Sequence, residues 1–244
     1  MKKLFIITSL IISIPLQSQN LNIEVTYVKG LKKKTEKKPR VLKDLIYSLI
    51  VNNKASLFKH NESMKMDDNM NRRFIALGGG KGIYYKNLKD KIKLRQVETR
   101  DGEKFRITYP INQYEWTLSK EKKMIDKYLC YKATAIYTEY NNLKKENVKF
   151  YITAWYTPDI PLPFGPAGYD GLPGLILEVK RGGFYFFASK INNANKKYLI
   201  ASPKKGKLIT LENYNKKTYQ KWLDIGLDKD YYKKRKKTYK QLKK

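Results

Sequence analysis

Runs of β-branched and aromatic residues, separated by short turn-forming or charged segments, recur along most of this 244-residue chain. Such runs favour strands, because branched and aromatic side chains pack well on a pleated surface. The runs lie at 22–28, 45–51, 55–60, 72–77, 82–85, 92–97, 104–109, 115–118, 128–140, 148–157, 175–180 and 184–191. Connections of hairpin length between them predict a mainly β fold, with one large curved antiparallel sheet, a meander that resembles half a barrel.

The pattern changes beyond about Leu208, where large apolar residues recur near helical spacing. These residues are Tyr214, Tyr219, Trp222, Leu223, Leu227 and Tyr231, and a run of basic residues begins at Lys233. We therefore expect a C-terminal α-helix with a solvated basic end. The predicted organisation is an antiparallel β domain over residues 19–205 and a helical, lysine-rich extension over residues 206–244.

The N-terminus has the pattern of a secretory signal peptide. Lys2 and Lys3 precede an apolar run from Leu4 to Leu16, and a polar segment follows. The run is shorter than the roughly 20 residues that a membrane-spanning helix needs. We expect residues 1–18 to be removed near Ser18 and the protein to be exported to the periplasm or the cell surface.

The charge balance suggests an anionic partner but does not specify it. Lysine and arginine number 52 against 22 acidic residues, a formal net charge of +30. Nearly all of the excess is lysine, whereas bidentate recognition of phosphate or guanine favours arginine. We therefore expect no specific nucleic-acid binding. The lysines are either spread over solvated faces or, at the C-terminus, attracted to anionic lipid.

Prolines and glycines are concentrated between residues 158 and 174. Five of the nine prolines occur there, with four glycines: Pro158, Pro161, Pro163, Gly165, Pro166, Gly168, Gly171, Pro173 and Gly174. Proline restricts the backbone and glycine permits unusual conformations, so the segment predicts a stiff, irregular loop. Leu172–Leu175 suits a type II turn with Pro173 second and Gly174 third. We expect Gly165, Pro166, Gly171 and Gly174 to be its structural positions.

Apolar side chains accompany this loop and are the candidate binding residues. They are Trp155, Tyr156, Phe164, Tyr169, Leu172 and Pro173. Two interpretations remain open. The rings could cover the open end of the sheet core, or they could form a binding surface for a partner or an apolar ligand.

Residues 171–176 read Gly-Leu-Pro-Gly-Leu-Ile, and further matching residues precede them in order. These are Trp116, Tyr128, Cys130, Lys132-Ala133, Ala154–Thr157, Ile160-Pro161 and Gly165-Pro166. In this set the chain resembles the GLPGLI family of exported bacterial proteins. The resemblance implies export to the envelope of Gram-negative bacteria and a gene neighbourhood that often contains outer-membrane receptors. We therefore expect an envelope protein or an outer-membrane receptor as the partner. It implies no established reaction, so it supplies no catalytic residues.

Chemistry-bearing residues are sparse. His60 is the only histidine, and Asp159, Asp170 and Glu178 flank the Pro/Gly loop without a spacing that indicates acid–base catalysis. The single cysteine, Cys130, excludes an intramolecular disulfide and is expected to be buried. The glycine run at 78–82 lacks the Ser or Thr of a phosphate loop and predicts a turn. We expect no catalytic residues, no metal site and no cofactor.

These observations favour a non-enzymatic exported protein that binds a partner through the Pro/Gly loop. The alternative is a carrier that holds a lipid or another apolar ligand inside the curved sheet. A hydrolase using Asp159, Asp170 or His60 is the third and weakest hypothesis.

Overall fold

A computed structural model describes residues 21–32, 38–61, 79–99, 101–141, 146–193 and 198–226. The predicted signal peptide, the predicted strand at 72–77 and the basic C-terminal run lie outside these residues. Among the helices of the described residues, none combines the length and the apolar character needed to span a membrane.

The first six strands form an antiparallel meander. They are β1 (Asn22–Leu31), β2 (Arg40–Asn52), β3 (Ala55–His60), β4 (Ile83–Asn87), β5 (Ile92–Glu98) and β6 (Lys104–Thr108). The hairpin predicted around residues 52–54 is confirmed. Asn52 Oδ1 accepts hydrogen bonds from the backbone N–H groups of Lys54 at 2.9 Å and Ala55 at 2.8 Å, which closes the turn.

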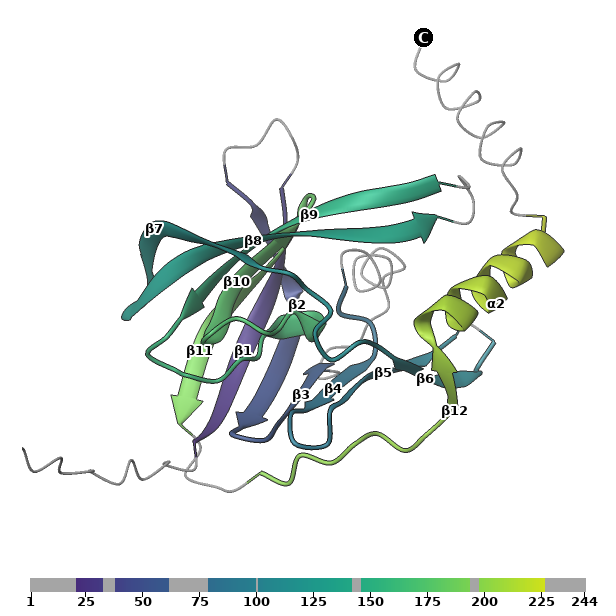
Figure 1. Cartoon of the computed structure of the whole chain (residues 1–244), viewed down its shortest axis with the longest axis horizontal. Helices are drawn as coiled ribbons and strands as arrows, with labels where there is room; N and C mark the ends of the chain where they lie inside the picture. The colour runs from purple at the N-terminus through teal and green to yellow at the C-terminus, as the bar shows by residue number, and fades with distance from the viewer. Residues whose placement is uncertain are drawn as a thin grey trace, which may run out of the picture.

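A second antiparallel meander follows and joins the first. Its strands are β7 (Thr117–Ile125), β8 (Tyr128–Asn141), β9 (Glu146–Thr157), β10 (Leu175–Arg181) and β11 (Phe184–Asn193). β1 pairs with β11 as well as with β2, so the described strands form one open sheet with β7 and β12 at its edges. Figure 1 shows this sheet curving, and the predicted fold class is confirmed.

The C-terminal part contains one strand that the sequence patterns did not predict. β12 (Lys207–Thr210) pairs with β6 in parallel, the one parallel pairing among the described strands. The predicted helix is α2 (Leu211–Asp224), which starts directly after β12. Thr210 caps it, because the Thr210 hydroxyl accepts a hydrogen bond from the backbone N–H of Asn213 at 3.2 Å.

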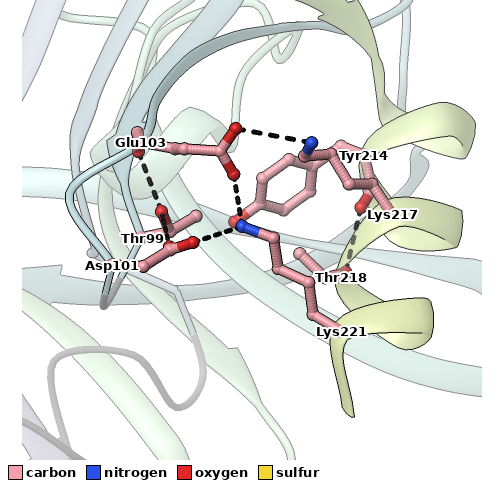
Figure 2. Close-up of polar contacts among 7 residues, drawn as sticks. All are labelled: Thr99, Asp101, Glu103, Tyr214, Lys217, Thr218 and Lys221. Carbon is pink, nitrogen blue, oxygen red and sulfur yellow. Dashed lines mark hydrogen bonds and ion pairs between the residues drawn. The ribbon is translucent and has the colours of Figure 1, made fainter. Parts of the chain in front are cut away.

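α2 packs against the hairpin between β5 and β6, as Figure 2 shows. The Tyr214 ring contacts Phe105 edge-on, with 5.6 Å between ring centroids. Lys221 pairs with both Asp101 and Glu103, and Lys217 lies 3.4 Å from Glu103. The hydrogen bond from Lys221 lowers the pKa of Asp101 to about 2. The helix is therefore held by apolar packing of Leu211 and Tyr214 and by a group of partly exposed ion pairs.

The main core lies on one face of the sheet. Alternate residues of β1 are buried, as period-2 patterning predicts, and the Tyr47 and Phe58 rings stack with centroids 5.2 Å apart. The Pro/Gly loop folds over this face, and its Ile160, Leu162 and Phe164 belong to the same core cluster. The loop is thus a packed element of the fold.

Candidate functional site

The Pro/Gly loop buries most of the predicted binding residues. Phe164, Tyr169 and Leu172 are buried in the core, and so is Tyr156 on β9. Trp155 is half-buried beneath Lys123, whose Nζ lies 4.4 Å from the ring centroid. Pro173 is exposed. Packing thus uses most of this apolar surface, and binding through Trp155, Tyr156, Phe164, Leu172 and Pro173 stays a prediction. Tyr169 and Gly165 also line a cavity.

The hexapeptide 171–176 closes the loop onto strand β10. The Gly174 N–H donates to Leu172 O at 2.8 Å, whereas the Leu175 N–H donates to Ile160 O at 3.0 Å. A type II turn needs φ of about +80° at its third residue, whereas Gly174 has φ +159°, so that expectation was wrong and the bond from Gly174 to Leu172 closes a three-residue turn. The hydrogen bond from the Leu175 N–H to Ile160 O joins the two ends of the loop.

Two of the loop's four predicted structural positions, Gly165 and Gly174, leave no room for a side chain. A Cβ on Gly174 would lie 2.1 Å from Thr157 O, and a Cβ on Gly165 would lie 2.7 Å from both Ile176 Cβ and Tyr169 O. Gly171 has φ +90°. Pro166 begins the short 3-10 helix η1 (Pro166–Gly168), which contacts β3 and β4.

A cavity of about 500 Å³ opens between η1, the concave face of the sheet and α2. Its wall is rich in aromatic rings, contributed by Phe58, Tyr84, Tyr85, Tyr109, Tyr114, Tyr137, Phe150, Tyr169 and Phe184. It also contains four cationic residues, Lys86, Lys93, Arg95 and Arg181, and two acidic residues, Glu139 and Asp170. We call this space the concave cavity. Its wall carries a net charge of +2, since four cations face two carboxylates.

Two lysines share one carboxylate in the wall of the cavity. Asp170 Oδ1 lies 2.8 Å from Lys86 Nζ, and Oδ2 lies 2.8 Å from Lys93 Nζ, with all three side chains 5% exposed. Lys86 also donates to Ile111 O at 3.1 Å, and the Trp116 indole N–H donates to Asp170 O at 2.8 Å. Burial lowers the pKa of Lys93, and Asp170 opposes that shift. This ion-pair triad fastens the loop to β4 and β5.

Arg181 occupies the side of the cavity near β8 and β9. Its guanidinium carbon lies 3.8 Å from the Phe150 ring centroid, and Nη2 lies 3.4 Å from Glu139 Oε2. Its charge also opposes the effect of burial, which raises the pKa of Tyr169. This guanidinium is therefore stacked, ion-paired and hydrogen-bonded within the protein.

Arg95 on β5 has a different environment. Its guanidinium carbon lies 5.6 Å from the Tyr84 ring centroid and 6.0 Å from that of Tyr109. One Nη donates a long hydrogen bond of 3.3 Å to the Tyr84 hydroxyl, while the buried Nε has no hydrogen-bond partner among the described residues. The described ion pairs include none with Arg95. Aromatic rings thus lie beside this charge, and no carboxylate of the described residues is within ion-pair distance of it.

A smaller cavity of about 280 Å³ lies between α2 and the β8–β9 hairpin. Glu139, Phe150 and Asn215 line both cavities, so the two spaces meet at these side chains. Asn215 belongs to α2, which therefore forms part of the wall of each.

The other chemistry-bearing residues do not gather into a site. His60 packs edge-on against Tyr47, and Glu178 pairs with Lys123 at 2.6 Å. Asp159 does not line the concave cavity. Cys130 is buried as predicted, and burial raises the pKa of its thiol to about 11. In the part of the chain that the structure describes, no three His, Cys, Asp or Glu residues cluster as metal ligands.

The sequence patterns missed Lys86, Lys93, Arg95 and Arg181 as cavity residues. A signal was present: Lys93 and Arg95 are two apart on one strand, so they share a face, and in register they lie opposite Lys86 and Tyr84. Charged residues at strand period beside aromatic ones can indicate a polar cavity. The sequence, however, does not show which face of β5 becomes concave.

The comparisons with known proteins agree with the β architecture. Residues 137–178 match a protein family described as "Protein of unknown function (Porph_ging)", and the matched segment includes the hexapeptide 171–176. None of the curated proteins matches this sequence.

Among solved structures, the chain is similar to PNGF-II in its C2 and P21 space groups, each with a TM-score of 0.52 and 17% sequence identity. The matches cover 80% and 82% of this chain but 32% and 33% of PNGF-II. The chain therefore spans about one third of the length of PNGF-II. At this identity the likeness shows the fold alone.

Proposed function

We propose that this chain is a non-enzymatic, exported binding protein of the GLPGLI family whose ligand site is the concave cavity. The observation that carries the proposal is the cavity itself: about 500 Å³, lined by aromatic rings and charged groups from several strands, the Pro/Gly loop and α2. Ligand pockets typically combine such rings with a few placed polar groups. The Pro/Gly loop serves this site by supplying Tyr169 and Asp170 to its wall.

The proposal favours binding over hydrolysis because the cavity carboxylates are engaged. Both oxygens of Asp170 contact lysines, and Glu139 contacts Arg181. A general base needs an accessible group within reach of its substrate. The charged wall also favours a polar ligand over the lipid tail of the carrier hypothesis, because an apolar chain would leave these charges without water or a partner.

The test is a matched pair of substitutions on α2. Asn215→Trp places a large ring between the two cavities, whereas Asn213→Trp makes the same change at an exposed position of the same helix. Native mass spectrometry is run on protein purified from an envelope extract without detergent. We expect an adduct on the wild type and on Asn213→Trp that organic extraction removes, and none on Asn215→Trp. An adduct that persists unchanged on Asn215→Trp contradicts a ligand site in this cavity.

Export and envelope partners form the wider part of the proposal. The basic N-terminus with its short apolar run supports export, with cleavage near Ser18 to be tested by sequencing the mature N-terminus. An envelope protein or outer-membrane receptor is the proposed partner, and the lysine-rich end is proposed to contact anionic lipid. Deleting residues 232–244 should weaken binding to anionic vesicles at low salt. Unchanged binding would contradict this lipid contact.

A further inference from the structure

Arg95 is the cavity cation whose charge the described residues leave without an acidic partner. Its Nε is buried and makes no hydrogen bond there, and its bond to the Tyr84 hydroxyl is long at 3.3 Å. Arg95 is half-buried, and a guanidinium remains protonated in proteins, so its charge persists in the cavity wall. Removing a charge from water is costly unless it is paired. An anion bound beside Arg95 would therefore supply the counter-charge that the described residues do not.

The other three cations of the cavity wall each have a carboxylate that balances their charge. Lys86 and Lys93 each lie 2.8 Å from an oxygen of Asp170, and Arg181 lies 3.4 Å from Glu139. Each of these three has a carboxylate within ion-pair distance. Both cavity carboxylates are thereby used, and neither is within ion-pair distance of Arg95.

Four tyrosines of the cavity wall, Tyr109 beside Arg95 among them, do not supply the missing negative charge. Burial raises the pKa of Tyr169 to about 12 and raises the pKa values of Tyr109, Tyr114 and Tyr137 as well. These hydroxyls are neutral at physiological pH. They offer ring faces and hydrogen bonds, which suit a flat ligand body, but they leave the charge on Arg95 uncompensated.

We propose that the ligand of the concave cavity is an organic acid with a cyclic body, whose oxyanion binds the Arg95 guanidinium while its ring packs among the cavity tyrosines. This inference rests on the proposed function, because it names the ligand class of that cavity. The cavity is much larger than a bare oxyanion, since a water molecule occupies about 30 Å³ in the liquid. A guanidinium fork matches carboxylate geometry, so two N–H groups of Arg95 can donate to the two oxygens of a carboxylate together.

The experiment observes the arginine Nε–H signals of the ¹⁵N-labelled protein by NMR during titration. The Arg95 signal is identified by its absence in Arg95→Lys, which keeps the charge but lacks Nε. Three probes are used at constant ionic strength: benzoate, its neutral counterpart benzamide, and inorganic sulfate. We expect benzoate to shift the Arg95 signal saturably, at a concentration about ten-fold below that needed for sulfate because of ring packing. Benzamide should leave the signal in place.

Two variants test whether the response belongs to this residue. Arg95→Gln should weaken benzoate binding at least about ten-fold, since a charged hydrogen bond is lost. Arg40→Gln removes the same charge from an exposed position and should bind as the wild type does. Because the signal is read in the wild type, the test holds even if Arg95→Gln folds poorly.

The outcomes separate this inference from the proposed function. If neither anion shifts the Arg95 signal, or if benzamide shifts it as much as benzoate does, the proposal that the ligand is an acid is contradicted. If sulfate shifts the signal at the same concentration as benzoate, the proposal that the ligand has a cyclic body is contradicted, and the ligand is a free inorganic oxyanion. In each case an adduct blocked by Asn215→Trp would still support the cavity as the ligand site. The cavity itself is contradicted as the ligand site only if Asn215→Trp carries the same adduct as the wild type.

Discussion

Gly174 is the residue at which the hexapeptide has the least freedom. Its α-carbon faces Thr157 O so closely that a Cβ would lie 2.1 Å from that oxygen. The same turn frees the Leu175 N–H to bond to Ile160 O. The close approach explains glycine at this position without reference to a ligand.

We predict that Gly174→Ala lowers the free energy of unfolding by at least about 2 kcal/mol, because the backbone must move to accept the methyl group. Gly182→Ala is the matched control, since Gly182 has φ +59° in a hairpin turn with no atoms within 4 Å of a Cβ. It should lose only about 1 kcal/mol, from the left-handed backbone. Urea unfolding of the two variants measures this difference, and equal losses would count against the steric explanation.

Lys29 is a fully buried lysine outside the cavity wall. Its Nζ donates to Gly79 O and lies 5.1 Å from the Phe186 ring centroid. Burial lowers the pKa of Lys29 to about 7 from the usual 10.5. Between these two values the unfolded chain binds a proton that the folded protein has released, so stability must rise with pH in this window.

We predict that, between pH 7 and pH 9, the free energy of unfolding of the wild type rises relative to that of Lys29→Met. The rise should be at most about 1.4 kcal/mol per pH unit. Below pH 7 both states hold the proton and the difference should level off. Urea unfolding at pH 6, 7.5 and 9 provides the measurement, with exposed Lys59→Met as the control. If the free energies of unfolding of wild type and Lys29→Met change in parallel with pH, the pKa of Lys29 is not lowered in the folded protein.

At the scale of elements, the ion-pair triad attaches the Pro/Gly loop to strands β4 and β5. Asp170 is 84 residues from Lys86 along the chain, yet their charged atoms are 2.8 Å apart. All three charges are almost completely buried. Such a group contributes little when complete but is costly to break, because each ammonium needs its counter-charge.

We predict that Asp170→Asn lowers the free energy of unfolding by roughly 3–5 kcal/mol, because two buried ammonium groups lose their carboxylate. Glu178→Gln removes a carboxylate from a more exposed pair with Lys123 and should cost less than about 1 kcal/mol. Chemical denaturation compares the two variants. A similar loss in both would mean that burial of the triad does not determine its contribution.

The attachment of α2 combines two kinds of contact with different strengths. The pairs of Lys221 with Asp101 and Glu103 are partly exposed, so each contributes little. The Tyr214 ring instead packs on the buried Phe105.

We predict that Tyr214→Ala removes hydrogen-exchange protection from α2 and lowers global stability by about 2 kcal/mol, below the loss for a fully buried ring. Lys221→Met should change stability by no more than about 1 kcal/mol. Mass-spectrometric hydrogen exchange over residues 211–224 distinguishes them. Greater deprotection in Lys221→Met than in Tyr214→Ala would assign the attachment to the ion pairs.

At the scale of the whole molecule, the net charge of +30 produces repulsion throughout the folded protein. Salt screens this repulsion, and it also screens the favourable exposed ion pairs, so the two effects oppose each other. Because basic residues outnumber acidic ones by more than two to one, repulsion should dominate.

We predict that the urea midpoint of unfolding rises between 20 mM and 300 mM NaCl without a change in the slope of the transition. An unchanged slope indicates that salt stabilises the fold without altering the surface exposed on unfolding. A midpoint that falls with salt would mean that the ion pairs outweigh the repulsion.

Much of the fold could be predicted from local patterns. The strand pair around Asn52, the long β8 and β9, and the helix after Leu208 all follow from periodicity and turn residues. β12 was missed because four residues carry too little periodicity, and its pairing with β6 depends on a partner about 100 residues earlier. Cys130 was correctly predicted to be buried, because free cysteine behaves as a small apolar side chain.

The sequence alone determined where strands and turns form, because alternation and the backbone limits of glycine and proline act over a few residues. Only the tertiary structure decided how the two meanders join, through the pairing of β1 with β11, and that the Pro/Gly loop turns inward. That folding brought Arg95 to the same cavity as Asp170 and Arg181, which lie far from it along the chain. Period-2 patterning specifies which residues share a face, but the curvature of the whole sheet decides which face encloses a space.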